Sequence, residues 1–302
     1  MTASTPTTVA IPPNVERSFQ SAPRFRREPY VVAAILEFGR ALESGRLAPS
    51  QTAETLLRRN PFALLLAILL DQGVPAERAF QAPQTLHERL GHLDPARMAG
   101  DEPGVLRAMS ARPMPHRFPA VGTRWIVRAA SRVSEELDGD VRRLWADRPT
   151  ARALQARFEA FDGIGQKKAA MAVEILARDF AVPLDEMSGS DVAVDVHVRR
   201  VFMRTGLSAS DSIDDIVRAA RELHPLRPGE LDVPVWMIGR TWCRPRSPKC
   251  SSCPISWACP SSTSYPQSAE DLVALRAPAT LAARKRAPVA RVGAGKDVSR
   301  NP

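Results

Sequence analysis

The sequence predicts an all-α protein, and two observations lead to that prediction. Apolar residues recur at spacings of three and four along residues 30–42, 53–70 and 125–137, which is the period of one helix face. No segment alternates apolar and polar residues convincingly enough for a strand. We therefore expect short packed helices around apolar cores rather than a sheet.

The helical segments follow one another with few interruptions. Residues 62–70 form a Leu-rich apolar run that is long enough for a buried helix. The pattern continues through residues 133–154 across short Gly, Asp and Pro breaks. Residues 169–177 are rich in alanine, a strong helix former, and a further helix is expected to begin near Val196.

The composition points to a polyanionic partner. The 302 residues include 42 Lys and Arg against 33 Asp and Glu, a formal net charge of +9. Such a surface attracts nucleic acid in a salt-dependent way, although charge balance alone is a weak signal. Residues 1–28 and 261–302 lack apolar periodicity, so we expect two disordered tails, the second of them basic.

The sequence shows no sign of a membrane segment. No stretch reaches the roughly 18–20 apolar residues needed to cross a bilayer. Residues 1–13 lack the basic start and the apolar run of a signal peptide. Together with the cysteine usage described next, these features indicate a cytoplasmic protein.

All four cysteines lie in one short segment near the end of the chain. Cys243, Cys250, Cys253 and Cys259 are separated by six, two and five residues. A disulfide framework would spread its cysteines over distant loops, and a structural zinc site usually has two close cysteine pairs. Four thiolates in one loop suit a [4Fe-4S] cluster, and zinc remains the alternative.

The first gap between these cysteines contains three cations. Arg244, Arg246 and Lys249 alternate with Pro245 and Pro248, which stiffen the loop by fixing φ. A stiff loop can present these cations to DNA phosphates. The cations can also offset the negative charge of a thiolate-bound cluster, and both roles can hold at once.

Residues 161–169 carry a second motif, in which Gly163 and Gly165 allow a tight turn between two helical segments. A Rossmann turn also contains spaced glycines, but here the preceding segment has the pattern of a helix and not of a strand. The motif is a helix-hairpin-helix signature. Its exposed amides, with the N-terminus of the following helix, form a natural phosphate site.

Three segments together resemble the endonuclease III family of DNA glycosylases, in that family's order. They are the hairpin at residues 161–169, residues 194–201 with the pattern V-D-x-H-x-x-R-V, and the cysteine loop from residue 239. The resemblance covers about residues 30–260 and is closer to a divergent bacterial branch than to endonuclease III itself. It implies a bacterial, nucleoid-associated monomer that repairs double-stranded DNA by base excision.

The resemblance also implies two helical domains with DNA in the cleft between them. We expect a six-helix barrel domain with the hairpin at residues 61–194 and an iron-sulfur cluster domain at residues 195–260. Residues 29–60 are expected to contribute N-terminal helices to the cluster domain.

Lys167 matches the catalytic lysine of the bifunctional family members, which implies AP lyase chemistry through a lysine Schiff base and β-elimination. The physical argument agrees, because an amine at a helix N-terminus lies in the positive field of the helix dipole, which favours its neutral, nucleophilic form. Lys168 would strengthen that effect by like-charge repulsion. The alternative is that both lysines only bind phosphate.

Asp195 matches the family's essential aspartate. A carboxylate in an apolar run is costly to bury unless it is used or capped. Its use would be to stabilise the cationic sugar as the base departs, or to take a proton from the nucleophile. An N-cap role for the helix near Val196 is compatible with this, and His197 is expected to make a structural hydrogen bond. The acidic loop at residues 183–191, longer than the family's connection, is expected beside the pocket, where it would alter which lesion is admitted.

Residues 69–73 lie where the family has a turn that fills the gap left by a flipped base, and Gln72 is the candidate for that role. A polar helix C-cap is the alternative. A wedge for the opposite strand is expected within residues 113–119. The candidates there are Met114, His116 and Phe118. Asp162 stands where the family's hairpin has proline, and is expected to cap the helix or tune the phosphate fit.

These interpretations predict a bifunctional DNA glycosylase and AP lyase for damaged or mismatched bases or abasic sites, with Lys167 and Asp195 as catalytic residues. The expected DNA contacts are Gln72, Gly163, Gly165, Gln166, Lys168, Arg244, Arg246 and Lys249. Two alternatives stay open. One is a monofunctional glycosylase or structure-specific endonuclease of the same fold, and the other is a non-catalytic iron-sulfur protein that binds DNA.

Overall fold

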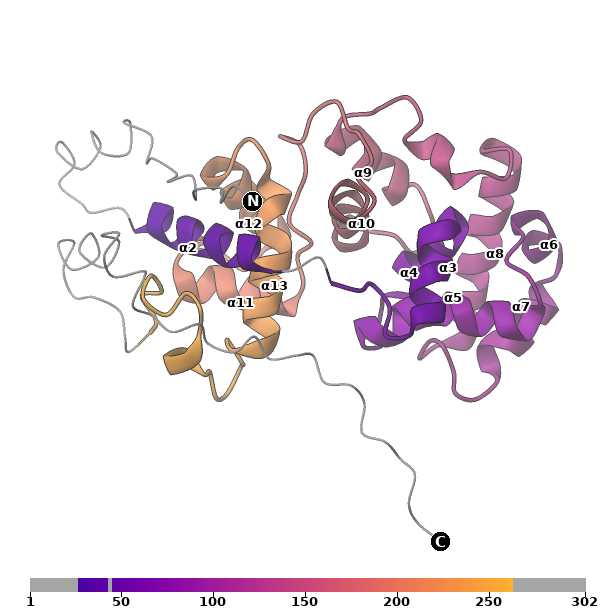
Figure 1. The fold of residues 1–302 in the computed structure, drawn as a ribbon, viewed down its shortest axis with the longest axis horizontal. Helices are drawn as coiled ribbons and strands as arrows, with labels where there is room; N and C mark the ends of the chain where they lie inside the picture. The colour runs from indigo at the N-terminus through magenta and orange to yellow at the C-terminus, as the bar shows by residue number, and fades with distance from the viewer. Residues whose placement is uncertain (1–26, 43–44, 263–302) are drawn as a thin grey trace, which may run out of the picture. The chain divides into compact units, whose positions relative to one another are not determined.

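The computed structural model describes residues 27–42 and 45–262, and the expected tails lie almost wholly outside these ranges. The described residues form helices joined by loops, with no strand among them, so the all-α prediction is confirmed (Figure 1). In chain order the elements are α2 (Glu28–Ala41), α3 (Gln51–Arg59), α4 (Pro61–Leu70), α5 (Ala76–Leu90), α6 (Pro95–Gly100), α7 (Glu102–Ser110), α8 (Pro119–Glu136), the 3-10 helix η1 (Val141–Leu144), α9 (Ala151–Glu159), α10 (Gln166–Asp179), α11 (Val196–Thr205), α12 (Ile213–Leu223), η2 (Pro228–Leu231), α13 (Asp232–Thr241) and η3 (Cys250–Ser252).

Several helices begin at a side chain that satisfies the free amides of the first turn. Asn60 shows the arrangement most fully, because its Oδ1 accepts from the N–H groups of Phe62 and Ala63 at 2.9 and 3.2 Å. Pro61 occupies the first helical position, where no N–H partner is needed. Ser50, Thr150 and Ser212 cap α3, α9 and α12 in the same way.

The first core is built around α4, in which all nine residues from Phe62 to Leu70 are buried. A helix that is apolar on every side has to be surrounded by other elements, and α3, α5, α8 and α10 all contact it. Residues 62–70 are therefore the buried helix that the sequence predicts. This helix ends at the candidate site.

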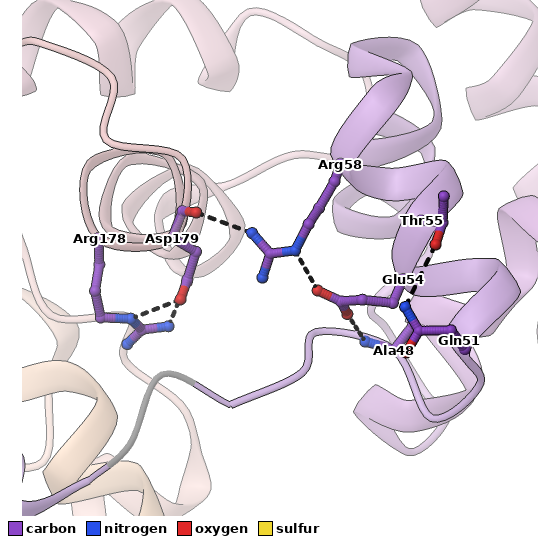
Figure 2. A network of polar contacts seen from close by, with 7 residues as sticks. All are labelled: Ala48, Gln51, Glu54, Thr55, Arg58, Arg178 and Asp179. Carbon is purple, nitrogen blue, oxygen red and sulfur yellow. Dashed lines mark hydrogen bonds and ion pairs between the residues drawn. The ribbon is translucent and has the colours of Figure 1, made fainter.

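α3 packs in this first core, which moves a predicted boundary. We expected residues 29–60 to join the cluster domain, but only α2 does so, while apolar residues of α3 are buried in the first core. Figure 2 shows the polar contacts that fix α3 there. Arg58 donates to Glu54 Oε1 at 2.7 Å and to the carbonyl oxygen of Asp179, at the end of α10, at 3.0 Å. The anchor lies 121 residues away in sequence, so the local helical pattern does not indicate it.

A second core joins α2 to α11, α12 and α13 (Figure 1). Ile35 of α2 packs with Val198 and Phe202 of α11 and with Ile255 of the cysteine loop. After α2, the chain returns to this core at Val192, before α11 begins. The cysteine loop is therefore part of the second core and does not hang from it.

Buried polar groups connect the two cores. The Asp191 carboxylate accepts two hydrogen bonds from Arg221 of α12, at 2.8 and 2.9 Å, and one from Gln155 of α9, at 3.1 Å. Asp232 of α13 accepts from the Ala193 N–H at 2.9 Å. Burial raises the pKa of Asp232 to about 7. These contacts hold residues 191–193, which lead directly to the candidate site.

Candidate active site

Of the two hairpin glycines, the fold requires the one at position 163 but not the one at position 165. Gly163 has φ of +85°, and a Cβ built there would lie 2.6 Å from the Trp125 ring of α8. Gly165 has an extended backbone, caps α10 with no side-chain hydrogen bond, and would place a Cβ within 4 Å of nothing. The fold therefore demands glycine at 163, whereas the glycine at 165 leaves open space over the first turn of α10.

Asp162 does not cap this helix, which was one of the two roles expected of it. Its carboxylate forms an exposed ion pair with Arg128 of α8. The N-cap position belongs to Gly165, three residues further on. The amides at the start of α10 are thus free of any side-chain acceptor, and the negative charge near them is already paired.

Lys167 lies in the first turn of α10 and meets a carboxylate that the sequence analysis gave no role. Its Nζ is 2.5 Å from Asp71 Oδ2, at the C-cap of α4. The Lys167 side chain is 35% exposed and that of Asp71 only 7%. The amine is therefore partly exposed, while its carboxylate partner is buried.

Lys168 points into the protein, and the prediction that it contacts DNA is wrong. Its Nζ donates to the carbonyl oxygens of Leu69 and Gly163 at 2.7 and 2.8 Å and lies 4.7 Å from the centre of the Trp125 ring. Only 5% of the residue is exposed. Burial lowers its pKa to about 8, Lys167 lowers it further, and Asp71 opposes both. Lys168 ties the hairpin to the end of α4 from inside.

Asp195 is the N-cap of α11, as the sequence indicated. Its Oδ1 accepts from the N–H groups of His197 and Val198 at 2.7 and 2.9 Å. His197 makes the structural contacts expected of it, with Nδ1 2.9 Å from Arg200 and its ring packed edge-on against Trp236. Because the cap uses Oδ1, the second carboxylate oxygen of Asp195 is available to the pocket.

A single cavity of about 610 Å³ brings the two candidate catalytic residues together. Lys167 and Asp195 both line it, along with Asp71 and Gln72 from the end of α4. Its remaining lining comes from the turn after Gln72, the hairpin, the residues around Asp195 and the start of α12. These are Gly73, Val74, Gly163, Gly165, Gln166, Lys168, Val194, Val196, Arg199 and Ile213.

The three wedge candidates in the loop at residues 113–119 differ in exposure, and Met114 is intermediate among them. His116 is 1% exposed and packs between Phe118 and Trp125, so it cannot insert into DNA. Phe118 is 53% exposed. Its ring edge would lie 3.9 Å from a Cβ at Gly73, next to Gln72. Phe118 and Gln72 are thus exposed neighbours beside the cavity.

The acidic loop at residues 183–191 does not lie beside the pocket, which corrects our expectation. None of its residues lines the cavity. The Asp185 N–H donates to the Pro149 carbonyl at 3.1 Å, and the Glu186 carbonyl accepts from the Ala151 N–H at 2.7 Å. The loop therefore covers the start of α9.

The Gln166 side chain is also engaged inside the protein. Its amide nitrogen donates to the Val192 carbonyl at 2.8 Å, and its oxygen accepts from the Val194 N–H at 3.4 Å. These two bonds fasten the hairpin to the segment that leads to Asp195. A direct DNA contact by Gln166 is thus left to its backbone.

No protein-family model matches the chain. Endonuclease III of Haemophilus influenzae is 35% identical over 106 residues, which are 34% of this chain and 44% of that relative. The chain thus spans less than half the length of the curated relative that it matches.

Solved structures match most of the chain, among them the following two. The structure of a trapped endonuclease III–DNA covalent intermediate, an estranged-adenine complex, has a TM-score of 0.58 at 19% identity, and the match covers 79% of this chain and 97% of that one. The chain has the endonuclease III fold. A thermostable thymine-DNA glycosylase has a TM-score of 0.55 at 17% identity, over 78% of this chain and 96% of that one.

In this endonuclease III fold the four cysteines gather at the second core. Cys243 and Cys253 pack against its apolar residues. Ile255 and Ala258 of the same loop are buried in this core, and burial raises the pKa of the Cys253 thiol to about 12. In the described part of the chain, no three His, Cys, Asp or Glu side chains converge on a point where one metal ion could bind. In a [4Fe-4S] cluster each thiolate binds a different iron, so the donor set fits that group without such convergence.

Two arginines that the sequence analysis gave no role hold the cysteine loop in the endonuclease III fold. Arg200 donates to the carbonyl oxygens of Cys243 and Gly239 at 2.5 and 2.8 Å. Arg204 donates to those of Arg244 and Pro245 at 2.7 and 2.8 Å. Their spacing of four on one helix face was the available signal, because it places both side chains toward the same neighbour.

The three cations of the first inter-cysteine gap, Arg244, Arg246 and Lys249, are all exposed. Within the described residues, none of their side chains has a hydrogen-bond or ion-pair partner recorded in the structure. They are placed to meet an external anion. In the same part of the chain, no helix is long and apolar enough to cross a membrane.

Proposed function

We propose that this protein is a base-excision DNA glycosylase with AP lyase activity, acting on damaged double-stranded DNA. The observation that carries the proposal is the shared cavity of Lys167 and Asp195, on the fold of endonuclease III. An amine and a carboxylate in one pocket are the two groups that base removal through a covalent sugar adduct requires. The matched segment of Haemophilus influenzae endonuclease III supports the same class of activity.

Each residue has one step in the proposed reaction. The neutral Lys167 amine attacks C1′ of the nucleotide, the C1′–base bond breaks, and the electron pair leaves with the base. The Asp195 carboxylate stabilises the positive charge that develops on the sugar. The C1′–O4′ bond of the sugar ring then breaks, a proton from the lysine nitrogen passes to O4′, and the Schiff base forms. Loss of a C2′ proton from this Schiff base expels the 3′ phosphate by β-elimination.

The surroundings of the cavity support a DNA substrate. The amides at the start of α10 have no side-chain acceptor, and Gly165 removes the Cβ that would keep a phosphate away from them. A base inside a duplex must be flipped out before Lys167 can reach its sugar. Gln72 and Phe118 are the exposed side chains beside the cavity that we propose fill the gap and wedge the opposite strand.

We further propose that Cys243, Cys250, Cys253 and Cys259 hold a [4Fe-4S] cluster. When bound, the cluster supplies a rigid, thiolate-ligated cross-link for the loop that presents Arg244, Arg246 and Lys249. Protein purified without oxygen should then be brown, absorb near ~400 nm and hold about four irons per chain. Stoichiometric zinc without iron would show that the site belongs to zinc.

One observation favours a second candidate, a monofunctional glycosylase. The Lys167 amine is paired with Asp71, so a purely structural role for it is available. In that case Asp195 would activate water instead of assisting a lysine, and base release would leave an intact abasic site.

The test is borohydride trapping on a panel of duplexes with different damaged or mismatched bases and with a pre-formed abasic site. A covalent adduct supports the glycosylase and lyase. Base release without an adduct supports the monofunctional enzyme, and DNA binding with neither supports a non-catalytic DNA-binding protein. Lys168→Ala tests the register of the hairpin, because it should keep the adduct that Lys167→Ala loses.

A further inference from the structure

The pocket holds two carboxylates, and the proposed chemistry uses only Asp195. In the described part of the chain, the Lys167 amine contacts the Asp71 carboxylate, with Oδ2 2.5 Å from Nζ. Its side chain is 7% exposed, so bulk water reaches it poorly. A carboxylate in direct contact with the attacking amine can act on the reaction.

The ends of two helices give the two carboxylates opposite environments. Asp71 is the C-cap of α4, where the helix dipole is negative and opposes a negative charge. Asp195 is the N-cap of α11, where the dipole is positive and two backbone N–H groups bond its Oδ1. Asp71 is therefore the carboxylate in contact with the amine, and Asp195 is the one held in place by its own helix.

The lysine chemistry needs an acceptor of this kind. An alkyl ammonium group is the predominant form of a lysine at neutral pH, and it has no electron pair with which to attack. The proton must move to a group that can later return it, because water has to leave when the Schiff base forms. Asp195 cannot serve both purposes, since a protonated Asp195 no longer stabilises a cationic sugar.

We propose that Asp71 is the proton-transfer partner of Lys167, taking a proton from its ammonium group and returning it during Schiff-base formation. This inference rests on the proposed lyase function and adds a second carboxylate to its site. It divides the work of the pocket, with Asp71 serving the amine and Asp195 serving the sugar.

At an open-chain abasic sugar the steps balance as follows. The ammonium group of Lys167 gives one proton to the Asp71 carboxylate, leaving an amine and a carboxylic acid. The amine adds to the C1′ aldehyde and forms a carbinolamine. The carboxylic acid then protonates the hydroxyl group, the C1′–O bond breaks, and water leaves with formation of the protonated Schiff base. Asp71 ends as the carboxylate it was at the start.

Other charged groups surround this pair and must be considered in any pH profile. Lys168 acts on Asp71 from the same helix as Lys167, and its pKa of about 8 means that its charge is being lost in the alkaline range. Asp195 and Arg199 line the cavity from the side of α11. Asp232, buried in α13, senses Lys167 electrostatically. Each of these groups is present in the wild-type protein and in every Asp71 variant. Because Asp71 raises the pKa of Lys168, Asp71→Asn lowers the pKa of Lys168 further, away from the alkaline range in which the rate should recover.

The experiment measures the single-turnover rate of borohydride-trapped adduct on a duplex with a pre-formed abasic site, from pH 5 to 10. Asp71→Asn keeps the shape of the side chain and removes the proton acceptor. At pH 7 the rate should fall by about 100-fold, the lower range of acid–base catalysis, and should recover as the pH rises toward about 10, where lysine amines lose their protons to solvent. Asp71→Glu should restore part of the rate and the wild-type pH dependence.

Asp147→Asn is the matched control, because Asp147 is also paired with a cation, through two bonds of 2.6 Å to Arg157, but does not line the cavity. It should leave the pH profile unchanged. If Asp71→Asn does not fold by circular dichroism, Asp71→Ser supplies a second variant without a proton acceptor, with the same expected profile.

The outcomes separate this inference from the function on which it rests. If wild type forms the adduct and folded Asp71→Asn forms it at the same rate or faster, with the same pH profile, the role of Asp71 is overturned and the lyase function stands. No adduct in wild type at any pH overturns the lyase, and the role of Asp71 with it.

Discussion

Lys167 and Asp195 stand at the same kind of place on two helices, the N-terminal end, but are held differently. Asp195 is fixed by two backbone hydrogen bonds through one oxygen. Lys167 is held by a single ion pair to Asp71. A fixed anion and a reachable amine are what a reaction with a cationic sugar and a mobile nucleophile needs.

Asp195→Asn separates the charge of this residue from its capping. Asparagine caps helices about as well as aspartate, so the variant should fold normally. Base excision should slow by several orders of magnitude, because the carboxylate that stabilises the sugar is lost. DNA binding should be equal or tighter, since a negative charge has left the cavity. Single-turnover base release and a DNA titration measure the two effects, and excision at the wild-type rate would remove Asp195 from the mechanism.

The two hairpin glycines provide a matched pair of variants. Gly163→Ala places a Cβ 2.6 Å from the Trp125 ring at a φ of +85° and should cost about 1–3 kcal/mol of unfolding free energy. Gly165→Ala meets nothing inside the protein and should leave stability nearly unchanged, while weakening DNA binding by crowding the amides of α10. Denaturant unfolding and DNA titration distinguish them. Equal loss of stability in both would contradict the assignment of Gly165 to an external ligand.

α11 connects the chemistry to the cysteine loop at the element scale. Its N-cap is Asp195, and further along the same helix Arg200 and Arg204 hold the backbone of the loop. A shift of this helix would therefore move Asp195, the proposed catalytic carboxylate, and the exposed cations together.

Asp232, which bonds the Ala193 N–H in the segment between the two cores, should make the free energy of unfolding depend on pH. Because the pKa of Asp232 is raised from 3.8 to about 7 in the folded protein, unfolding releases a proton between those values. Asp232 therefore contributes stability that is fully present below about pH 4 and is lost as the pH rises through about 7.

Asp232→Asn should remove that dependence. Between pH 4.5 and 7.5 the melting temperature of wild type should fall relative to that of the variant. Asp214→Asn, at an exposed position in the first turn of α12, is the control and should follow wild type. If the melting temperatures of wild type and Asp232→Asn change in parallel with pH, Asp232 ionises normally in the folded state.

Across the whole molecule, local patterns predicted the helices, the hairpin and the Asp195 cap, because these depend on residues close in sequence. The contacts that escaped prediction join distant segments. Asp71 meets Lys167 across 96 residues, and Lys168 meets the Leu69 carbonyl across 99. Which of two adjacent lysines faces outward depends on how α10 packs against α4, and the sequence of the hairpin does not contain that information.

The exposed cations of the cysteine loop predict a salt-dependent term in DNA binding. If Arg246 contacts a phosphate, Arg246→Ala should reduce the slope of log K against log salt by about one unit. Arg218→Ala, an exposed arginine of α12 already paired with Asp215, is the matched control and should leave the slope unchanged. Titrations between low and moderate salt measure both. If Arg246→Ala and wild type have equal slopes, Arg246 does not contact a phosphate. The remaining role for the loop cations is then to offset the negative charge of the cluster.

The central claim, that Lys167 is the nucleophile of this pocket, is tested most directly by locating the trapped adduct. Cleavage after Glu159 and Glu174 releases a peptide that contains both Lys167 and Lys168. Fragmentation of that peptide by mass spectrometry should place the reduced sugar on Lys167, because Lys168 is buried against Leu69 and Gly163. A reduced sugar on Lys168, or on a lysine outside this peptide, would contradict the account.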